Sequence, residues 1–150
     1  MSPEELRDFT AGQRVLTCAS VGPAGRPHLM PLWFVADGDA LLAWTYARSQ
    51  KTKNLERCPQ ATVQLEAGAS YEALRGVMHE CDVELITDPE RVAAIGLAVA
   101  LRYAPGDLTA ESAPPELREF VARQASKRIG LRFIPTRTVS WDHRKLGGAY

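Results

Sequence analysis

The fold is decided by the stretch Trp44-Thr45-Tyr46-Ala47-Arg48-Ser49-Gln50-Lys51-Thr52-Lys53-Asn54, which passes from β-forming residues into good helix formers. Alternation from Ala40 to Tyr46 predicts a strand, and Arg48 to Arg57 predicts a short basic helix that Pro59 ends. The first backbone N–H groups of such a helix lack partners and carry a partial positive charge. With the polar side chains beside them, they predict a cradle for one phosphate group, formed by Thr45, Arg48, Ser49, Lys51 and Lys53.

The same stretch has a simpler explanation. Basic residues on a short surface helix are usually solvated, and spacing alone favours that interpretation. The composition limits the choice of ligand, because 18 lysines and arginines balance 18 aspartates and glutamates. No net positive field exists to attract nucleic acid or an anionic membrane, so any anion binding must be local.

Further β-rich and helical patterns surround this joint. The expected strands are Arg14 to Val21, Arg26 to Ala36, Ala61 to Glu66, Leu74 to Ile86 and Ile129 to Trp141. The expected helices are residues 3–11, a lid or dimer element at most, one that begins after Asp88-Pro89, and one from Leu117 to Ala125. This order predicts a mainly β protein of the α+β class, a small antiparallel barrel with helices packed on one side.

Length and composition predict a single domain over residues 1–150, with one sizeable core. The N-terminus lacks the basic start and apolar run of a secretory signal, and no stretch approaches the roughly 18 apolar residues of a membrane span. We therefore expect a soluble cytoplasmic protein. Cys18, Cys58 and Cys81 are odd in number and far apart, which predicts reduced, mostly buried thiols.

Neither a metal site nor a catalytic side chain is predicted. His28, His79 and His143 share no metal-ligand spacing. His79 and Cys81 would lie on one face of a strand, where a buried thiol is a better explanation than a cysteine nucleophile. The sequence also lacks a Walker loop, a dinucleotide glycine fingerprint and a nucleophile elbow.

Aromatic side chains provide possible walls for a planar ring. Trp33, Trp44, Tyr46 and Trp141 could stack against one, although an ordinary core position is the more common role for each. Trp141, near the chain end and beside charged residues, is the best candidate for the edge of a binding site.

Four segments together resemble the pyridoxamine 5′-phosphate oxidase-like split barrels, which bind FMN or the deazaflavin coenzyme F420. These segments are Gly25-Arg26-Pro27-His28-Leu29-Met30-Pro31-Leu32-Trp33-Phe34, Ser49-x-Lys51-x-x-Asn54-Leu55-x-x-x-Pro59, Tyr71-Glu72-Ala73-Leu74-Arg75-Gly76-Val77 and Ser140-Trp141-Asp142. The resemblance implies an FMN-binding type of split β-barrel that forms a homodimer, with the cofactor in a groove between the two subunits.

The resemblance also implies which residues bind the cofactor. They are Met30, Pro31 and Leu32 beside the ring, Trp44 and Thr45 along the ribityl chain, Ser49, Lys51 and Lys53 at the phosphate, and Trp141 from the partner subunit, with Arg48 and Asn54 as further candidates. Oxidases of pyridoxamine phosphate have an arginine at the position of Met30 and a C-terminal Arg-x-His motif that is absent here. These departures argue against oxidation of vitamin B6.

The compact length and the strand Pro31-Leu32-Trp33-Phe34 look more like the branch that uses reduced F420 as a hydride donor. The resemblance therefore implies an F420-dependent oxidoreductase that reduces a small acceptor such as an enone or a quinone. The alternatives are an FMN-dependent reductase or oxidase, a flavin- or deazaflavin-binding protein without turnover, and a general phosphate- or nucleotide-binding module.

Overall fold

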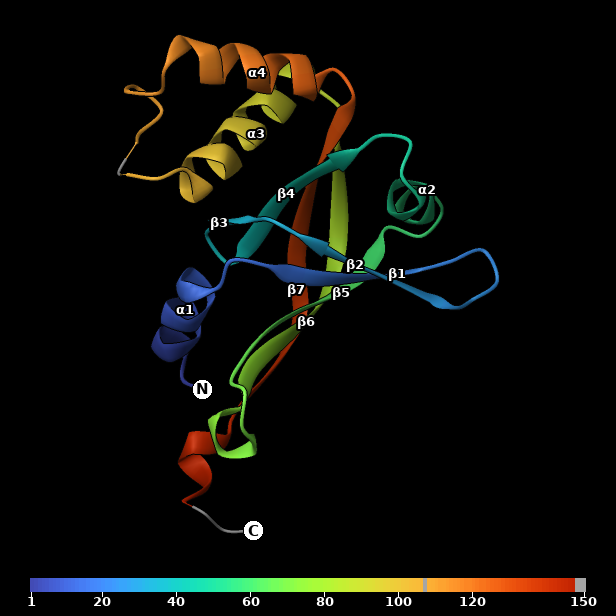
Figure 1. The fold of residues 1–150 in the computed structure, drawn as a ribbon. Helices are drawn as coiled ribbons and strands as arrows, with labels where there is room; N and C mark the ends of the chain where they lie inside the picture. The colour runs from blue at the N-terminus through green and yellow to red at the C-terminus, as the bar shows by residue number, and fades with distance from the viewer. Residues whose placement is uncertain (107, 148–150) are drawn as a thin grey trace.

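A computed structural model describes residues 1–106 and 108–147 (Figure 1). The strands are β1 (Leu16–Val21), β2 (Pro27–Leu32), β3 (Val35–Asp37), β4 (Ala40–Tyr46), β5 (Gln60–Ala67), β6 (Arg75–Ile86) and β7 (Arg128–Asp142). The helices are α1 (Pro3–Gly12), α2 (Gln50–Arg57), α3 (Pro89–Tyr103) and α4 (Pro115–Ala125), with short 3-10 turns η1 (Tyr71–Ala73) and η2 (His143–Leu146). The α+β class is confirmed, and the element order agrees with the expectation except that one expected strand is divided into β2 and β3.

All seven strands belong to one antiparallel sheet in the order β2-β1-β5-β6-β7-β4-β3. β6 pairs along its whole length with residues 130–142 of β7, and the two strands extend from the α3–α4 end of the molecule to η1 and η2 at the other (Figure 1). The last strand therefore lies inside the sheet, between β6 and β4.

The two edge strands β2 and β3 are consecutive in the chain and are joined only by Trp33 and Phe34. The sheet must therefore curl so that its edges approach each other at this joint. We expected one continuous strand from Arg26 to Ala36. The backbone of Phe34 instead bonds to side chains of α3, since its N–H donates to the Tyr103 hydroxyl at 3.2 Å and its carbonyl accepts from Arg102 at 2.6 Å.

The end of α3 fastens this joint to the N-terminal part of the chain. The Arg102 guanidinium also donates to the carbonyls of Ala11 and Gln13, at 3.0 and 2.7 Å. The ring of Trp33 stacks on Tyr103, with the centroids 4.3 Å apart and the planes 5° from parallel. One helix end thus holds α1, the start of β1 and the β2–β3 joint together.

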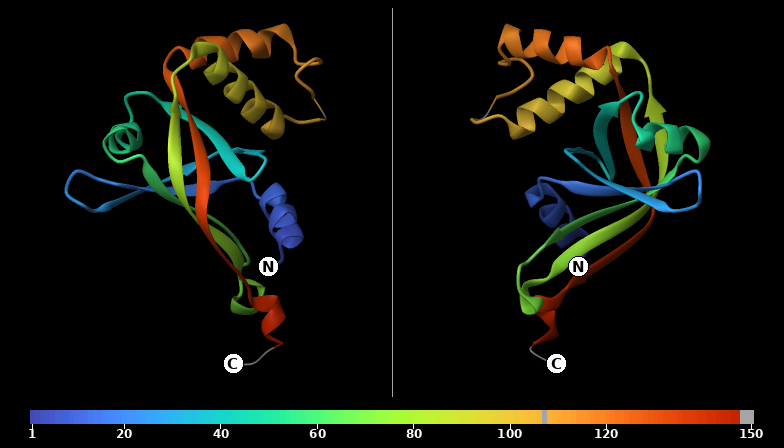
Figure 2. Two further views of the ribbon diagram at one scale, coloured as in Figure 1. Left: turned by 180° about the vertical axis from the view of Figure 1, so that it is seen from behind. Right: turned by 45° about the vertical axis from the view of Figure 1, so that its right-hand side comes forward.

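The helices lie on several sides of the sheet rather than on one. α3 and α4 form a layer at one end, whereas α1 and α2 lie on opposite sides (Figure 2). α1 was expected to be a lid or dimer element at most, but its Phe9 is buried in the main core with Leu16, Val63 and Phe133. No helix in the described ranges is both long and apolar enough to cross a membrane.

Candidate functional site

The predicted strand-to-helix joint is present where β4 passes into α2. Ser49 caps the helix, because its hydroxyl accepts from the Thr52 N–H at 3.3 Å. The Thr52 hydroxyl in turn donates to the carbonyl of Tyr46 at 3.0 Å and lies 3.0 Å from the Ser49 hydroxyl. These bonds fix the direction in which the first N–H groups of α2 point.

Lys51 is buried beneath this joint and is only 5% exposed. Its Nζ donates to the Thr45 hydroxyl at 2.7 Å. Burial lowers the pKa of Lys51, while the nearby Cys18 acts in the opposite direction. Burial raises the pKa of Cys18 to about 11, so that side chain is a thiol at neutral pH. Within the part of the chain that the structure describes, the buried Lys51 forms no ion pair with a carboxylate.

Asn54 pins the middle of α2 to β1. Its side chain is fully buried, and its Nδ2 donates to the Ser20 hydroxyl at 3.1 Å. Its Oδ1 accepts from the Gln50 amide at 2.9 Å. Asn54 therefore has a structural role as the anchor of the helix that carries Ser49 and Lys51.

Strand register brings β2 to the same face as these residues. Cys18 lies opposite Met30 and Leu16 lies opposite Leu32. Directly opposed residues of an antiparallel pair point to the same face, so Met30 and Leu32 share the face of Cys18 and Lys51. Met30 is 43% exposed, whereas Pro31 points to the opposite face. This face therefore combines exposed apolar surface with a buried cation.

His28 belongs to this face and was not predicted as a site residue. It lies opposite Ser20, one side-chain step along β2 from Met30. Its Nδ1 is buried and has no hydrogen-bond partner in residues 1–106 and 108–147. The alternation of β2 could have suggested its position, because residues 28, 30 and 32 share a face. Whether its Nδ1 has a hydrogen-bond partner can be seen only in the folded structure.

Trp44 and Thr45 are consecutive residues of β4, so their side chains point to opposite faces of the strand. Trp44 lies over α3 at Gly96, where an added Cβ would come within 2.4 Å of its ring. The Arg128 guanidinium covers that side, 4.6 Å from the Trp44 ring centroid and 4.3 Å from that of Tyr46. Of the two residues, only Thr45 lies with Lys51.

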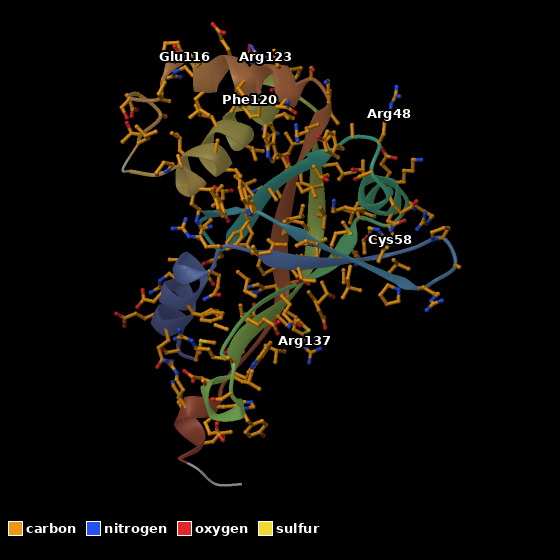
Figure 3. All side chains as sticks on the ribbon, in the orientation of Figure 1. Arg48, Cys58, Glu116, Phe120, Arg123 and Arg137 are labelled. Carbon is orange, nitrogen blue, oxygen red and sulfur yellow. The ribbon has the colours of Figure 1, made fainter. Side chains whose placement is uncertain are left out.

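Arg48 and Lys53 are both exposed beside the start of α2. Figure 3 shows Arg48 extending away from the body of the protein. Both cations are free to turn toward an anion at the helix start. Ser49, Lys51, Thr45 and Asn54 are therefore brought together by the fold, and Arg48 and Lys53 lie at the rim.

Trp141 lies far from this site within one chain. Thr45 pairs with Ile129, whereas Trp141 pairs with Gly76, twelve residues further along β7. Twelve strand residues span on the order of 40 Å. Trp141 can join the α2 face only if it comes from a second copy of the chain.

The cavity with the largest volume given for the described residues lies away from the predicted site residues. A cavity of about 340 Å³ crosses β1, β5, β6 and β7, and it includes none of the predicted site residues. The described residues contain no group of three or more histidine, cysteine, aspartate or glutamate side chains that could hold a metal ion.

The α2 face fits a planar cofactor with an anionic tail. Met30 and Leu32 offer apolar surface for a ring, and the start of α2 offers cations and backbone donors. Among residues 1–106 and 108–147, the buried polar residues include no aspartate or glutamate that would repel a phosphate.

Comparison with known proteins agrees with this geometry. The sequence pattern of the family described as "Pyridoxamine 5′-phosphate oxidase" matches residues 2–143. No protein with a curated description matches the chain significantly. The chain is similar to the crystal structure of the conserved hypothetical protein Rv2991 from Mycobacterium tuberculosis, with 38% identity, 98% of this chain and 88% of that chain covered, and a TM-score of 0.86.

Two more distant structures show the breadth of the fold. A protein described as an F420 reductase is 22% identical, with 91% of this chain and 98% of that chain covered and a TM-score of 0.65. The haem storage protein HutZ from Vibrio cholerae is 16% identical, with 91% and 92% covered and a TM-score of 0.69. At these identities the likeness concerns the fold alone.

Proposed function

The chain belongs to the pyridoxamine 5′-phosphate oxidase family, and we propose that it is an oxidoreductase that uses reduced coenzyme F420 to transfer hydride to a small organic acceptor such as an enone or a quinone. The observation that carries the proposal is the α2 face, where the buried Lys51 and the capped helix start adjoin the exposed Met30 on the same face. A protein that shares this fold is described as an F420 reductase, which makes F420 the first cofactor to test.

In this proposal the start of α2 holds the phosphate of the cofactor. Ser49 and Lys51 contribute the fixed contacts, while Lys53 and Arg48 add exposed positive charge. Thr45 orients the Lys51 ammonium through the bond at 2.7 Å. Asn54 holds the helix in place rather than touching the cofactor.

Met30 and Leu32 of β2 flank the ring, and Pro31 shapes the strand between them. The bound reduced deazaflavin supplies the hydride, so no catalytic side chain is required of the protein. The protein contributes binding, orientation and exclusion of water. Trp44 is assigned to packing against α3 in this proposal, because it lies on the other face of β4.

We further propose that the working form is a homodimer. The edge strand β2 leaves Leu29 and Met30 exposed, and Val139 and Ile134 are exposed on β7. Exposed apolar side chains on an edge strand favour cover by another chain. A second copy would also bring Trp141 to the α2 face. The three unpaired thiols fit a reducing, cytoplasmic location.

Titration of the purified protein with F420 and with FMN, followed by their fluorescence and visible spectra, tests the proposal. We expect saturable binding of F420 and oxidation of its reduced form when a quinone or an enone is added. Saturable binding of FMN alone would instead support the alternative of an FMN-dependent enzyme. A tight complex that no acceptor oxidises would support a binding protein without turnover, and binding of neither cofactor would overturn the proposal.

A further inference from the structure

A further cavity lies between α1 and the hairpin of β3 and β4, on the opposite side of the molecule from α2 (Figure 2). Its volume is about 280 Å³, and it includes no residue of the α2 face. Arg7, Ala11 and Asp39 lie at its exposed rim, whereas Leu41 and His79 are the buried part of its lining. A molecule from solution can therefore enter the cavity and reach its buried end.

His79 presents an unpaired nitrogen to this cavity. The residue is 6% exposed, and its Nδ1 lies 2.8 Å from the Thr138 hydroxyl on β7. Its Nε2 has no hydrogen-bond partner in residues 1–106 and 108–147. Within those ranges, His28 Nδ1 is the side-chain atom that is both buried and unpaired, so His79 Nε2 retains solvent-accessible surface. Because His79 lines the cavity, a ligand in the cavity can reach that nitrogen.

The walls around His79 are mainly apolar. Ala36 and Leu41 are directly opposed in the β3–β4 pair and therefore share a face, and Leu6 of α1 lies across from them. An apolar cavity with a single polar atom favours a ligand with the same distribution of groups. Since a cavity of about 150 Å³ with apolar walls is enough to hold benzene, this one has room for a substituted ring.

The electrostatics of the cavity favour an uncharged hydroxyl as the polar group of the ligand. Burial lowers the pKa of His79, so its ring is neutral at pH 7. Arg7 and Asp39 have opposite charges and give the rim no net preference for an ion. The Thr138 hydroxyl can donate to Nδ1 or accept from it, which leaves Nε2 as a donor or as an acceptor. A ligand hydroxyl matches either tautomer.

We propose that this cavity binds a small phenol, with the ring against Leu6, Ala36 and Leu41 and the hydroxyl hydrogen-bonded to His79 Nε2. A rigid ring loses little conformational freedom on binding, which favours it over a flexible alcohol of similar size. The inference is independent of the proposed function, because the cavity lies away from the α2 face and its ligand requires no cofactor.

Phenol itself is the probe, and it is titrated into the full chain without cofactor. Nitrogen NMR follows the Nε2 resonance of His79, which should shift as phenol is added. We expect saturable binding with a Kd on the order of 1 mM or below, the range for so small a ligand.

Two substitutions of His79 separate ligand binding from internal packing. His79→Asn keeps a polar atom near the place of Nδ1, where it can bond to Thr138, but it lacks the outer nitrogen. His79→Gln keeps a polar atom near the place of Nε2. We expect His79→Asn to weaken phenol binding about tenfold, as for the loss of one hydrogen bond, and His79→Gln to retain most of the affinity. Thermal unfolding without phenol measures the stability of both variants.

Filling the cavity tests its location. Ala11→Phe places a large side chain at the rim and should abolish phenol binding. Ala122→Phe is the matched control, because Ala122 is also an exposed helical alanine but lies on α4, outside the lining. It should leave phenol binding unchanged.

Three results would overturn the inference. Absence of phenol binding to the wild-type protein would show that the cavity does not accept this ligand. Retained binding in Ala11→Phe would place the phenol elsewhere on the protein. Wild-type affinity in a less stable His79→Asn variant would make His79 a packing residue only. None of these results depends on F420 or FMN, so they leave the proposed function untouched.

Discussion

The Nζ atom of Lys51 donates a hydrogen bond to the Thr45 hydroxyl at 2.7 Å inside the protein, and the buried polar residues of the described ranges include no aspartate or glutamate. A buried ammonium of this kind is costly to desolvate, which is the reason that its pKa is lowered. The position of a buried lysine at the start of α2 is explained if its ammonium group binds the anionic part of a ligand.

Replacing Lys51 by methionine should therefore separate binding from stability. The free energy of unfolding should change by less than about 1 kcal/mol, because loss of a buried charge offsets the unpaired Thr45 hydroxyl. Cofactor affinity should fall by about 1.5 to 3 kcal/mol, as for a lost charge-assisted contact. Urea unfolding and fluorescence titration measure the two effects.

Lys53→Met is the matched control, since Lys53 lies on the same helix with the same charge but is exposed. It should weaken binding by less than about 1 kcal/mol, the range of an exposed charge. An equal loss in both variants would mean that the helix attracts anions diffusely and that Lys51 makes no direct contact.

The proposed sharing of Trp141 between subunits can be tested by mixing two variants that each bind the cofactor weakly. Lys51→Met damages the α2 side of a site, and Trp141→Ala damages the side supplied by the other copy. A mixed dimer then contains one site with both changes and one site with neither. Refolding the two variants together should restore cofactor binding to some of the sites, as measured by titration.

Each variant refolded alone is the control and should bind weakly. No recovery on mixing, together with a dimer by light scattering, would argue that Trp141 lies outside the site. A monomer by light scattering would contradict the interface site itself.

The contact between Gly96 and Trp44 predicts a stability effect away from the candidate site. A methyl group at Gly96 would come within 2.4 Å of the Trp44 ring, so either α3 or the ring must move. Gly96→Ala should lower the free energy of unfolding by about 1 to 3 kcal/mol, as for an overpacked core. Gly12→Ala, with no atom within 4 Å of the added group, is the control. An unchanged Gly96→Ala protein would mean that α3 packs less closely on β4.

Two ion pairs near the chain ends predict a loss of stability in acid. The hydrogen bond from Lys145 lowers the pKa of Glu5 to about 2, and the hydrogen bond from Arg144 lowers that of Asp142 to about 2. Both values lie below the roughly 4 of an unfolded carboxyl group. The stabilisation is therefore complete above about pH 4.5 and is lost as the pH falls toward 2.

Urea unfolding at pH 7, 4 and 2.5 measures this loss. Glu5→Gln should reduce the pH dependence of the free energy of unfolding, because it removes the titrating carboxylate. The same carboxylate accepts from the Ser2 N–H in the α1 cap. Glu4→Gln, on the same turn but without an ion pair among the described residues, is the control. An identical pH dependence in wild type and Glu5→Gln would show that the Glu5–Lys145 pair contributes no stability in solution.

The parts of the fold with strong local signals were predictable from sequence. The α2 joint follows from Ser49 as a cap, and α3 begins where Asp88 caps a helix and Pro89 takes its first position. The break at Trp33 and Phe34 could not be predicted, because it depends on Arg102 and Tyr103, almost 70 residues away.

In the candidate site, too, some features follow from local sequence and others depend on residues that are distant in the chain. Strand alternation alone places the side chains of Trp44 and Thr45 on opposite faces of β4, and the packing of Trp44 against Gly96 of α3 depends on a distant part of the chain. The burial of Lys51 and the unpaired His28 Nδ1 depend on how α2 and β2 lie against β1, which no local pattern encodes. Ser49, Lys51 and Met30 stay predictions as cofactor ligands until a complex is measured.

The place of β7 between β6 and β4 has a consequence for how the chain folds. Until residues 128–142 have left the ribosome, β4 with β3 has no strand to join it to the rest of the sheet. Pairings between residues so distant in sequence give a high contact order and slow folding. During synthesis the incomplete sheet would expose the β4 and β6 edges, so a chaperone or rapid completion of the C-terminal strand should limit aggregation.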